Sequence, residues 1–202
     1  MYNANFFASD MNIFYLDHDV KRCAEMHNDK HCVKMILEYA QLLSTAHRIL
    51  DGVPQRLRRE NTGRQYTTYS LPDNRDVVLY SATHINHPSA IWVRETAINY
   101  LWLQELLDAL CKEYTYRYGK VHKVEASGLL EALREVPDNI DKTYEFTQPT
   151  PAMPDDCKVY DEVATDRYTI NSLASYRNYY TKNKTHLANW KNRPVPDWFV
   201  TI

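Results

Sequence analysis

An apolar row of side chains recurs at helical spacing between residues 29 and 52. The row advances by alternate steps of four and three residues through Ile36, Ala40, Leu43, His47 and Leu50. Such steps keep side chains on one face of an α-helix, because each residue turns the helix by about 100°. Asp19 or Asp29 can cap this helix at its start, and Gly52 ends it. The segment predicts a long helix packed on the core, and it restricts the fold more than any other part of the chain.

A polar row runs along the same helix with the same steps. It passes through His27, His31, Lys34, Glu38, Gln41 and Thr45. Glu38 lies two positions from Ile36, about 200° around the helix, so we expect this row to face away from the core. A solvated helix face is the plainest interpretation. Solvated faces favour Glu and Lys over paired histidines, however, so a metal site and an acid/base site are also considered.

A metal site is the weaker of these two alternatives. Histidines four residues apart can share an ion, but Glu38 lies seven residues beyond His31, about 10 Å along the helix axis. A metal would need ligands from elsewhere, such as His84, His87 or His122, and the sequence has no HExxH motif. We therefore expect no metal and no other cofactor.

An acid/base site fits the polar row better. A carboxylate beside a lysine can stay ionised or become a base, and a histidine can move a proton near neutral pH. We therefore predict catalytic roles for His31, Lys34 and Glu38. His27 and Gln41, on the same row, are predicted to bind the substrate.

A second long helix is predicted from Asn86 to Gly119. Asn86 can cap it, and Pro88 stands in the first turn, where its missing N–H does no harm. Its apolar residues spread around the circumference, so we expect it to be the most buried helix. Helix starts attract anions, and the aromatic, basic run from Tyr114 to Lys123 suits stacking on bases and neutralising phosphates. The substrate-binding residues predicted here are Asn86, His87, Arg94, Tyr118, Lys120 and His122.

Other segments also have interpretable patterns. Residues 11–17, MNIFYLD, favour a short strand or a buried extended segment. Residues 53–83 contain scattered prolines and a glycine among polar residues, which predicts a long exposed loop. A short helix from Glu125 to Glu135 precedes a proline-rich stretch, residues 148–154, expected to lie extended across the helices. Residues 167–196 are predicted to form a basic, mainly helical C-terminal segment.

Charge is unevenly distributed along the chain, whose net charge is −2 at pH 7. Residues 167–196 carry six basic residues and no acidic one, so they contribute +6 and the remainder −8. A second basic group, residues 56–64, contributes +3. Concentrated positive charge indicates phosphate partners at particular surfaces. The predicted phosphate-binding residues are Arg56, Arg58, Arg59, Arg64, Arg177, Lys182 and Lys184.

The composition excludes several classes of protein. The chain has 202 residues, enough for one core, and no apolar run approaches the roughly 18 to 20 residues that span a bilayer. With four glycines and neither a GxGxxG nor a GxxxxGK[ST] motif, dinucleotide and P-loop sites are not expected. Four cysteines without a CxxC pair are expected to be reduced thiols. Residues 1–10 lack the features of a secretory signal, so we expect a cytoplasmic protein, no membrane partner and a dispensable extension before Met11.

Together these patterns predict a mainly α protein. We expect a single-domain helical bundle over residues 1–202 with long central helices. Residues 53–83 would be a long loop insertion in this bundle, and a short extended segment would begin at Met11.

Several strings resemble a family of small proteins encoded by tailed bacteriophages. They are MNIFYLD, CAEMHNDKHCVKMILEYAQLLSTAHRILDG, NHPSAIWVRETAINYLWL, EYTYRYGKVHK and SYRNYYTKNKTHLANWKNRPVPDWF. The resemblance covers most of the chain from Met11 onward, with residues 53–83 the least similar part. It implies a phage-encoded protein in the host cell cytoplasm.

The chain is more distantly similar to the endonuclease V type pyrimidine-dimer DNA glycosylases. The shared order is a short MxI-like start, an AxxH string on the first helix ending at His27, a His-Pro turn before a long helix, and an aromatic, basic tail. Those enzymes are small α-helical proteins that excise damaged bases with an N-terminal amine and a glutamate on the first helix. Counting from His27, the glutamate position falls near Lys34 here. Because residues 1–10 precede Met11, Lys34 is a candidate to replace the amine as nucleophile.

We therefore expect an enzyme that acts on DNA or nucleotides at a base or its N-glycosidic bond, in DNA modification or repair. It would be a DNA glycosylase-like or nucleotide-modifying hydrolase. One alternative is a non-catalytic nucleotide- or nucleic-acid-binding protein that modulates the host or counters its defences. Another is a protein–protein adaptor whose polar row is only solvated.

Overall fold

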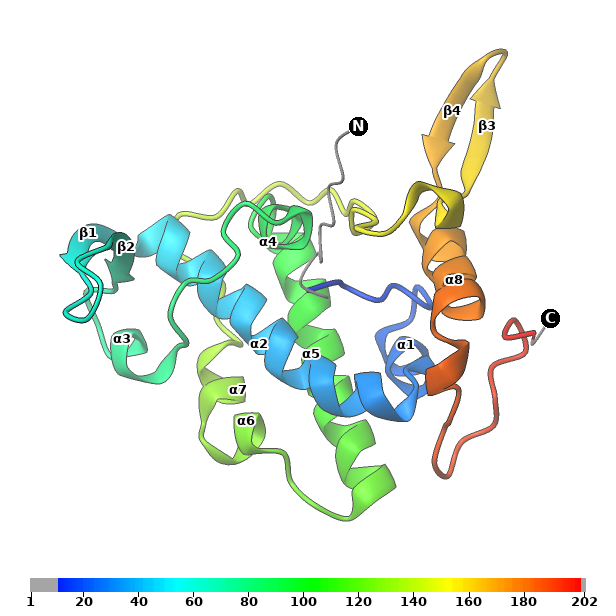
Figure 1. Ribbon diagram of the computed structural model, residues 1–202, viewed down its shortest axis with the longest axis horizontal. Coiled ribbons are helices and arrows are strands. Elements are labelled where there is room, and N and C mark those ends of the chain that lie inside the picture. Colours follow the sequence, from blue (N-terminus) through cyan, green and yellow to red (C-terminus); the bar gives the residue numbers. More distant parts are fainter. Residues whose placement is uncertain (1–10, 201–202) are drawn as a thin grey trace.

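Two long helices form the centre of the molecule in the computed structural model, which describes residues 11–200. α2 (Asp29–Asp51) packs across α5 (Ala97–Tyr118), and α1 (Val20–Met26) also contacts α5 (Figure 1). α4 (Pro88–Val93) contacts both long helices. Both predicted long helices are thus present, and the expected extension over residues 1–10 lies outside the described residues.

A turn at His27 and Asn28 divides the first predicted helix. Asp19 caps α1, since its Oδ1 accepts a hydrogen bond at 2.8 Å from a backbone N–H of the first turn. Asn28 caps α2 in the same way, with an N–H to Oδ1 distance of 2.9 Å. The cap of α2 is therefore Asn28 and not the expected Asp29, and His27 follows the end of α1.

Glycines end both long helices as predicted. The Gly52 N–H donates to Arg48 O at 3.2 Å, and a Cβ at Gly52 would lie 2.3 Å from that oxygen. Gly119 has a φ of 65°, in the left-handed region that favours glycine. Both helices therefore end at positions where a side chain would clash or would strain the backbone.

The second predicted helix is also two helices, α4 and α5. Thr96 starts α5, because its Oγ1 accepts a hydrogen bond from Asn99 N at 3.2 Å. The residue that caps α4 is His87, whose Nδ1 accepts from Ser89 N at 3.2 Å, and not the expected Asn86. The helical pattern of the sequence continues past these positions, but the local caps divide the helix itself.

Two antiparallel hairpins overturn the prediction of a mainly α helical bundle. β1 (Val53–Arg58) pairs with β2 (Gln65–Ser70), and β3 (Tyr160–Ala164) pairs with β4 (Arg167–Ile170). The described residues are 46% helical and 11% strand. The expected loop over residues 53–83 therefore contains a hairpin, followed by the short helix α3 (Arg75–Val78). Tyr and Thr in QYTTYS favour strands, and this preference outweighs the turn residues around them.

The remaining elements are short. α6 (Lys123–Ala126) and α7 (Leu129–Ala132) replace the single helix expected from Glu125 to Glu135, and Gly128, at a φ of 79°, separates them. α8 (Ser172–Asn183) ends earlier than the predicted C-terminal helical segment, which begins instead with β4. Two single 3₁₀ turns, η1 (Asp155–Cys157) and η2 (Thr185–Leu187), lie on either side of α8 in the chain.

The proline-rich stretch over residues 148–154 has no helix or strand, as predicted, and it connects the region of α4 to α8 (Figure 1). Ser172 N donates to Gln148 Oε1 at 3.0 Å, and Ser172 Oγ donates to Pro149 O at 2.6 Å. Tyr176 Oη adds a hydrogen bond to Thr150 O at 3.2 Å. These contacts hold the start of α8 against the extended stretch.

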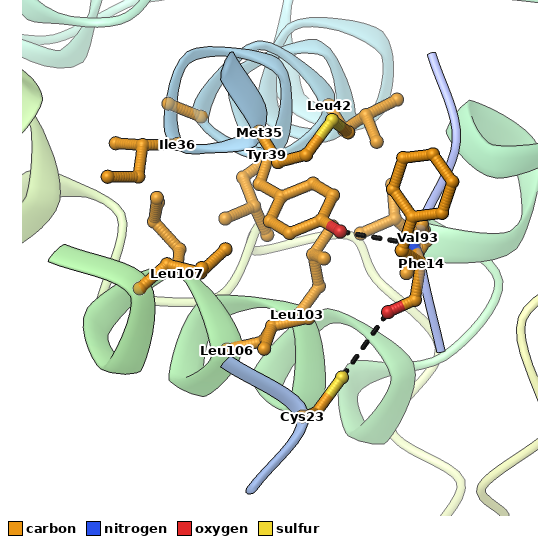
Figure 2. Packing of buried hydrophobic residues seen from close by; sticks show 14 of the residues in the cluster. Phe14, Cys23, Met35, Ile36, Tyr39, Leu42, Val93, Leu103, Leu106 and Leu107 are labelled. Carbon is orange, nitrogen blue, oxygen red and sulfur yellow. Dashed lines mark hydrogen bonds between the residues drawn. The ribbon is translucent and has the colours of Figure 1, made fainter. Parts of the chain in front are cut away.

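The predicted N-terminal segment is buried and extended. Figure 2 shows Phe14 beside α2, where its N–H donates to Tyr39 Oη at 3.1 Å and its carbonyl accepts from Cys23 Sγ at 3.3 Å. Side chains thus satisfy backbone groups that have no neighbouring strand. All four cysteines are buried and free of disulfides. Among residues 11–200, no helix is long and apolar enough to cross a membrane.

Candidate functional site

A groove of about 500 Å³ opens along α2 and brings distant segments of the chain together. Four of its lining residues belong to the predicted site: Lys34, Glu38, Gln41 and His122. The others are Met11, Val33, Leu37, His84 and Lys123. The sequence pattern indicates His84 only as a possible metal ligand, and it predicts no site role for Met11 or Lys123. Lys123 ends the aromatic, basic run that contains His122, so its signal was present, whereas the position of Met11 depends on tertiary packing.

Lys34 and Glu38 form an ion pair on the α2 side of the groove. Lys34 Nζ lies 3.0 Å from Glu38 Oε1, at the four-residue spacing that joins side chains on a helix surface. The Lys34 side chain is 48% exposed, but that of Glu38 is only 11% exposed. The groove therefore has a carboxylate at its base and an ammonium nearer its rim.

The expectation that the whole polar row faces away from the core is wrong. His27, His31, Glu38 and Thr45 are buried, whereas Lys34 is exposed. Amphipathic patterns assume one covered face, but α2 is contacted by α4, α5 and α6 and by strand β2. The row is therefore covered over much of its length by elements that the sequence pattern does not reveal.

His31 and His27 lie in the core and do not line the groove. The His31 ring stacks on Phe14 with 4.1 Å between ring centroids, and its Nδ1 lies 2.5 Å from Tyr180 Oη. His27 Nδ1 donates to the Cys23 carbonyl at 2.7 Å. Burial lowers the pKa of His27 to about 4 and that of His31 to about 2, so both rings are neutral at pH 7. The structure does not bring His31 into the groove with Lys34 and Glu38.

His84 contributes a strained backbone to the groove wall. Its φ is 48°, a left-handed conformation that costs of order 1–3 kcal/mol in a residue other than glycine. Thr45 on α2 holds the preceding residue from both sides, because its Oγ1 accepts from Thr83 N at 3.2 Å and donates to Thr83 O at 3.3 Å. Thr45, on the polar row, therefore fixes the backbone next to His84 in the groove wall.

His122 forms another part of the wall as a neutral ring. Its Nδ1 accepts from Val124 N at 3.2 Å and caps α6, so the ring proton is assigned to Nε2. Burial, with a smaller contribution from the neighbouring Lys123, lowers the pKa of His122. The groove thus combines a neutral imidazole donor, two ammonium groups at Lys34 and Lys123, and one buried carboxylate. This balance of charge favours an anionic ligand.

Other predicted substrate-binding residues lie outside the groove. Arg94 donates to Ile85 O and Ala90 O at 2.8 and 2.7 Å, which fixes the end of α4. His87 uses its Nδ1 as the cap of α4. The Tyr118 hydroxyl donates to Asp29 O at 3.4 Å. The predicted residues that the structure does not bring to the groove lining are His27, Asn86, His87, Arg94, Tyr118 and Lys120.

The C-terminal members of the predicted phosphate set contact the protein itself. Arg177 Nε donates to Leu16 O at 2.9 Å, and Lys182 Nζ donates to Asp156 O at 2.6 Å. Lys184 Nζ lies 4.9 Å from the centroid of the Tyr179 ring. Some of the cationic groups in this segment are therefore already bound by other parts of the protein. By contrast, Arg56, Arg58, Arg59 and Arg64 are exposed on the β1–β2 hairpin.

A second cavity of about 550 Å³ lies between α1, α5 and the C-terminal segment. None of the predicted site residues lines it. Its buried carboxylate, Glu113, accepts from Arg117 Nε at 2.6 Å and from Arg193 Nη2 at 2.8 Å. Asp108 is paired with Lys112 and lies 3.8 Å from Arg134. Glu113 is held by two guanidinium groups and none of the predicted site residues lines this cavity, so the α2 groove is the better candidate for chemistry.

No protein-family model, curated protein or solved structure matches the chain. Within residues 11–200, no group of three or more His, Cys, Asp or Glu side chains is arranged to hold a metal ion.

Proposed function

We propose that the α2 groove is the active site of a glycosylase-like enzyme that acts on DNA or a nucleotide at a base or its N-glycosidic bond. The observation that carries this proposal is the Lys34–Glu38 pair, in which a buried carboxylate lies 3.0 Å from an ammonium at the groove rim. Partly buried carboxylates beside a cation are common in acid/base catalysis. The distant similarity to pyrimidine-dimer DNA glycosylases supports the same class of reaction.

The proposed reaction is hydrolysis of the C1′–N bond. As this bond breaks, its electron pair leaves with the base and positive charge develops on the sugar. Glu38 would stabilise that charge and take a proton from the water that adds to C1′. The departing base takes up a proton from solvent, and the Nε2–H of His122, in the assigned tautomer, can donate a hydrogen bond to it.

Lys34 is assigned to binding in this proposal. An imine route would require its neutral Nζ to displace the base at C1′. The ion pair with Glu38 instead presents an ammonium, which suits a phosphate of the substrate. Lys123 adds a second cation to the same groove.

Replacing Glu38 with Gln tests the proposal, because the amide keeps the shape of the side chain but cannot accept a proton. We expect Glu38→Gln to lower the rate of base release at least ~100-fold while the protein stays folded. Hydrolysis is measured by mass spectrometry on duplex oligonucleotides. It appears as loss of the base from a uracil substrate, or as gain of one water at a thymine photodimer, whose joined bases stay attached to the strand. Borohydride added to the same reaction should trap no protein–DNA adduct.

The matched control is Glu162→Gln, since Glu162 is exposed on β3. Equal rates of base release in the two variants would contradict the role of Glu38. A trapped adduct that is lost in Lys34→Arg would replace hydrolysis by the imine route. Binding of every oligonucleotide with no product would support the non-catalytic alternative instead.

A further inference from the structure

The β1–β2 hairpin is an arm that packs very little of its surface against the rest of the molecule. All six residues of β1 and the first three of β2 are exposed. A two-stranded ladder without a packed face gains little stability from burial, so stability does not account for the arm. Figure 1 shows the arm at the C-terminal end of α2.

Four arginines of the arm, Arg56, Arg58, Arg59 and Arg64, are unpaired within the described residues 11–200. There their guanidinium groups form no ion pair and donate no hydrogen bond. Arg59 lies over the Tyr66 ring, with 5.8 Å between Cζ and the ring centroid. Arginines elsewhere, such as Arg48 and Arg117, bond to the protein at several points. Clustered arginines without partners are the composition that binds a polyanion.

The strand register gives this charge an order. Arg56 is opposite Thr67 and Arg58 is opposite Gln65, so Arg56 and Arg58 lie on one face of the hairpin. Arg59 lies over Tyr66, which is opposite Leu57 on the other face. Same-face neighbours on a strand are about 6.8 Å apart, which equals two steps of the roughly 3.4 Å rise of a DNA strand. The major groove of duplex DNA, about 12 Å wide, admits a two-stranded ribbon of this kind.

Arg48 fixes the root of the arm to α2. It is buried, and its guanidinium donates to Tyr69 O, Tyr80 O and Leu79 O at 2.8, 2.7 and 2.8 Å. It also pairs with Asp76 at 2.6 Å. An arm that is already ordered can bind without a large entropic cost.

The distance from the arm to the groove determines which substrate can contact both. Asp51, the last residue of α2, lies thirteen positions after Glu38, which is about 20 Å along the helix. This is about six base pairs of duplex, so a mononucleotide cannot reach from one to the other. We propose that the arm holds the backbone of duplex DNA, which makes a duplex, and not a free nucleotide, the substrate. This inference rests on the proposed function of the groove.

The test compares binding of a 20-base-pair duplex by the full chain and by a variant with all four arm arginines changed to Gln. A matched control changes Lys21, Lys30, Lys142 and Arg167 to Gln, because these exposed cations lie outside the arm and the groove. If each arginine neutralises one phosphate, the slope of log affinity against log salt becomes shallower by about 3 to 4 in the arm variant only. Changing the four arginines to Lys should keep most of the slope, which separates loss of charge from loss of fold.

Equal affinity and equal salt slope in the arm variant and the control would overturn the proposal. A loss that is equally large for a single strand of the same sequence would also overturn it, since the arm would then not select duplex. Failure of the groove proposal is recognised separately. In that case Glu38→Gln and Glu162→Gln would give equal product, whereas duplex binding would still depend on the arm arginines.

Discussion

Three buried histidines link the stability of the molecule to pH at the scale of single residues. Burial lowers the pKa of His27 and His47 to about 4 and that of His31 to about 2. The His47 ring lies 2.8 Å from Tyr100 Oη through Nε2, and its Nδ1 accepts from Arg75 at 3.1 Å. All three rings are therefore held neutral by their surroundings.

The free energy of unfolding should fall as the pH is lowered from about 6.5 towards 4. The unfolded chain binds protons at the ordinary histidine pKa of about 6.5, whereas the folded chain does not, so protonation favours unfolding in this range. Each buried histidine contributes up to about 1.4 kcal/mol per pH unit. The measurement is the urea midpoint at pH 7, 6, 5 and 4.5.

Variants assign this pH dependence to the buried rings. His31→Gln should flatten the dependence of the unfolding free energy on pH, while His186→Gln, at an exposed position, should leave it unchanged. A stability that is constant between pH 7 and 5 in the original chain would contradict the neutral, buried state of these histidines.

At the scale of elements, side-chain caps decide where the helices start. The Asn28 side chain accepts from His31 N at 2.9 Å at the start of α2. This bond separates α1 from α2 and turns His27 towards Tyr39, 3.0 Å away between Nε2 and Oη. The start of α2 in turn sets the position of Lys34 and Glu38 around the helix.

Asn28→Ala should lower the free energy of unfolding by about 1 kcal/mol, because one N–H of the first turn of α2 loses its acceptor. Asn74→Ala is the matched control, since Asn74 precedes α3 but makes no side-chain cap bond. Both values come from urea unfolding at pH 7. An equal, small effect in the two variants would show that the Asn28 bond does not stabilise α2.

The sequence predicts the elements that depend on residues close together in the chain. The long helices, their glycine ends, the buried segment from Met11 and the extended proline-rich stretch all follow from periodicity or from backbone chemistry. The break at Asn28 and the hairpin at residues 53–70 are missed, because a single cap or a strand preference competes with a longer pattern. The periodic row of polar residues was real, but its burial depends on neighbours that are distant in sequence.

The candidate site was predicted only in part for the same reason. Lys34, Glu38 and Gln41 share a helix, so their spacing places them together. His122 joins them across the fold, and nothing in one sequence indicates that α6 lies beside α2. His31 keeps the correct spacing but is turned into the core by Phe14 and Tyr180.

At the scale of the whole molecule, α2 connects the groove proposed to act on a base with the arm proposed to hold a duplex. The groove lies along the middle of α2. The arm follows the C-terminal end of the same helix (Figure 1), so one helix fixes the spacing between them. The most direct measurement is the NMR titration of the histidine side chains with a 20-base-pair duplex. His84 and His122 line the groove, whereas His18 and His186 are exposed elsewhere and serve as internal controls. We expect the signals of His84 and His122 to shift most and to stop shifting at the duplex concentration that saturates binding. Unchanged signals from both, at a duplex concentration that saturates binding, would contradict it.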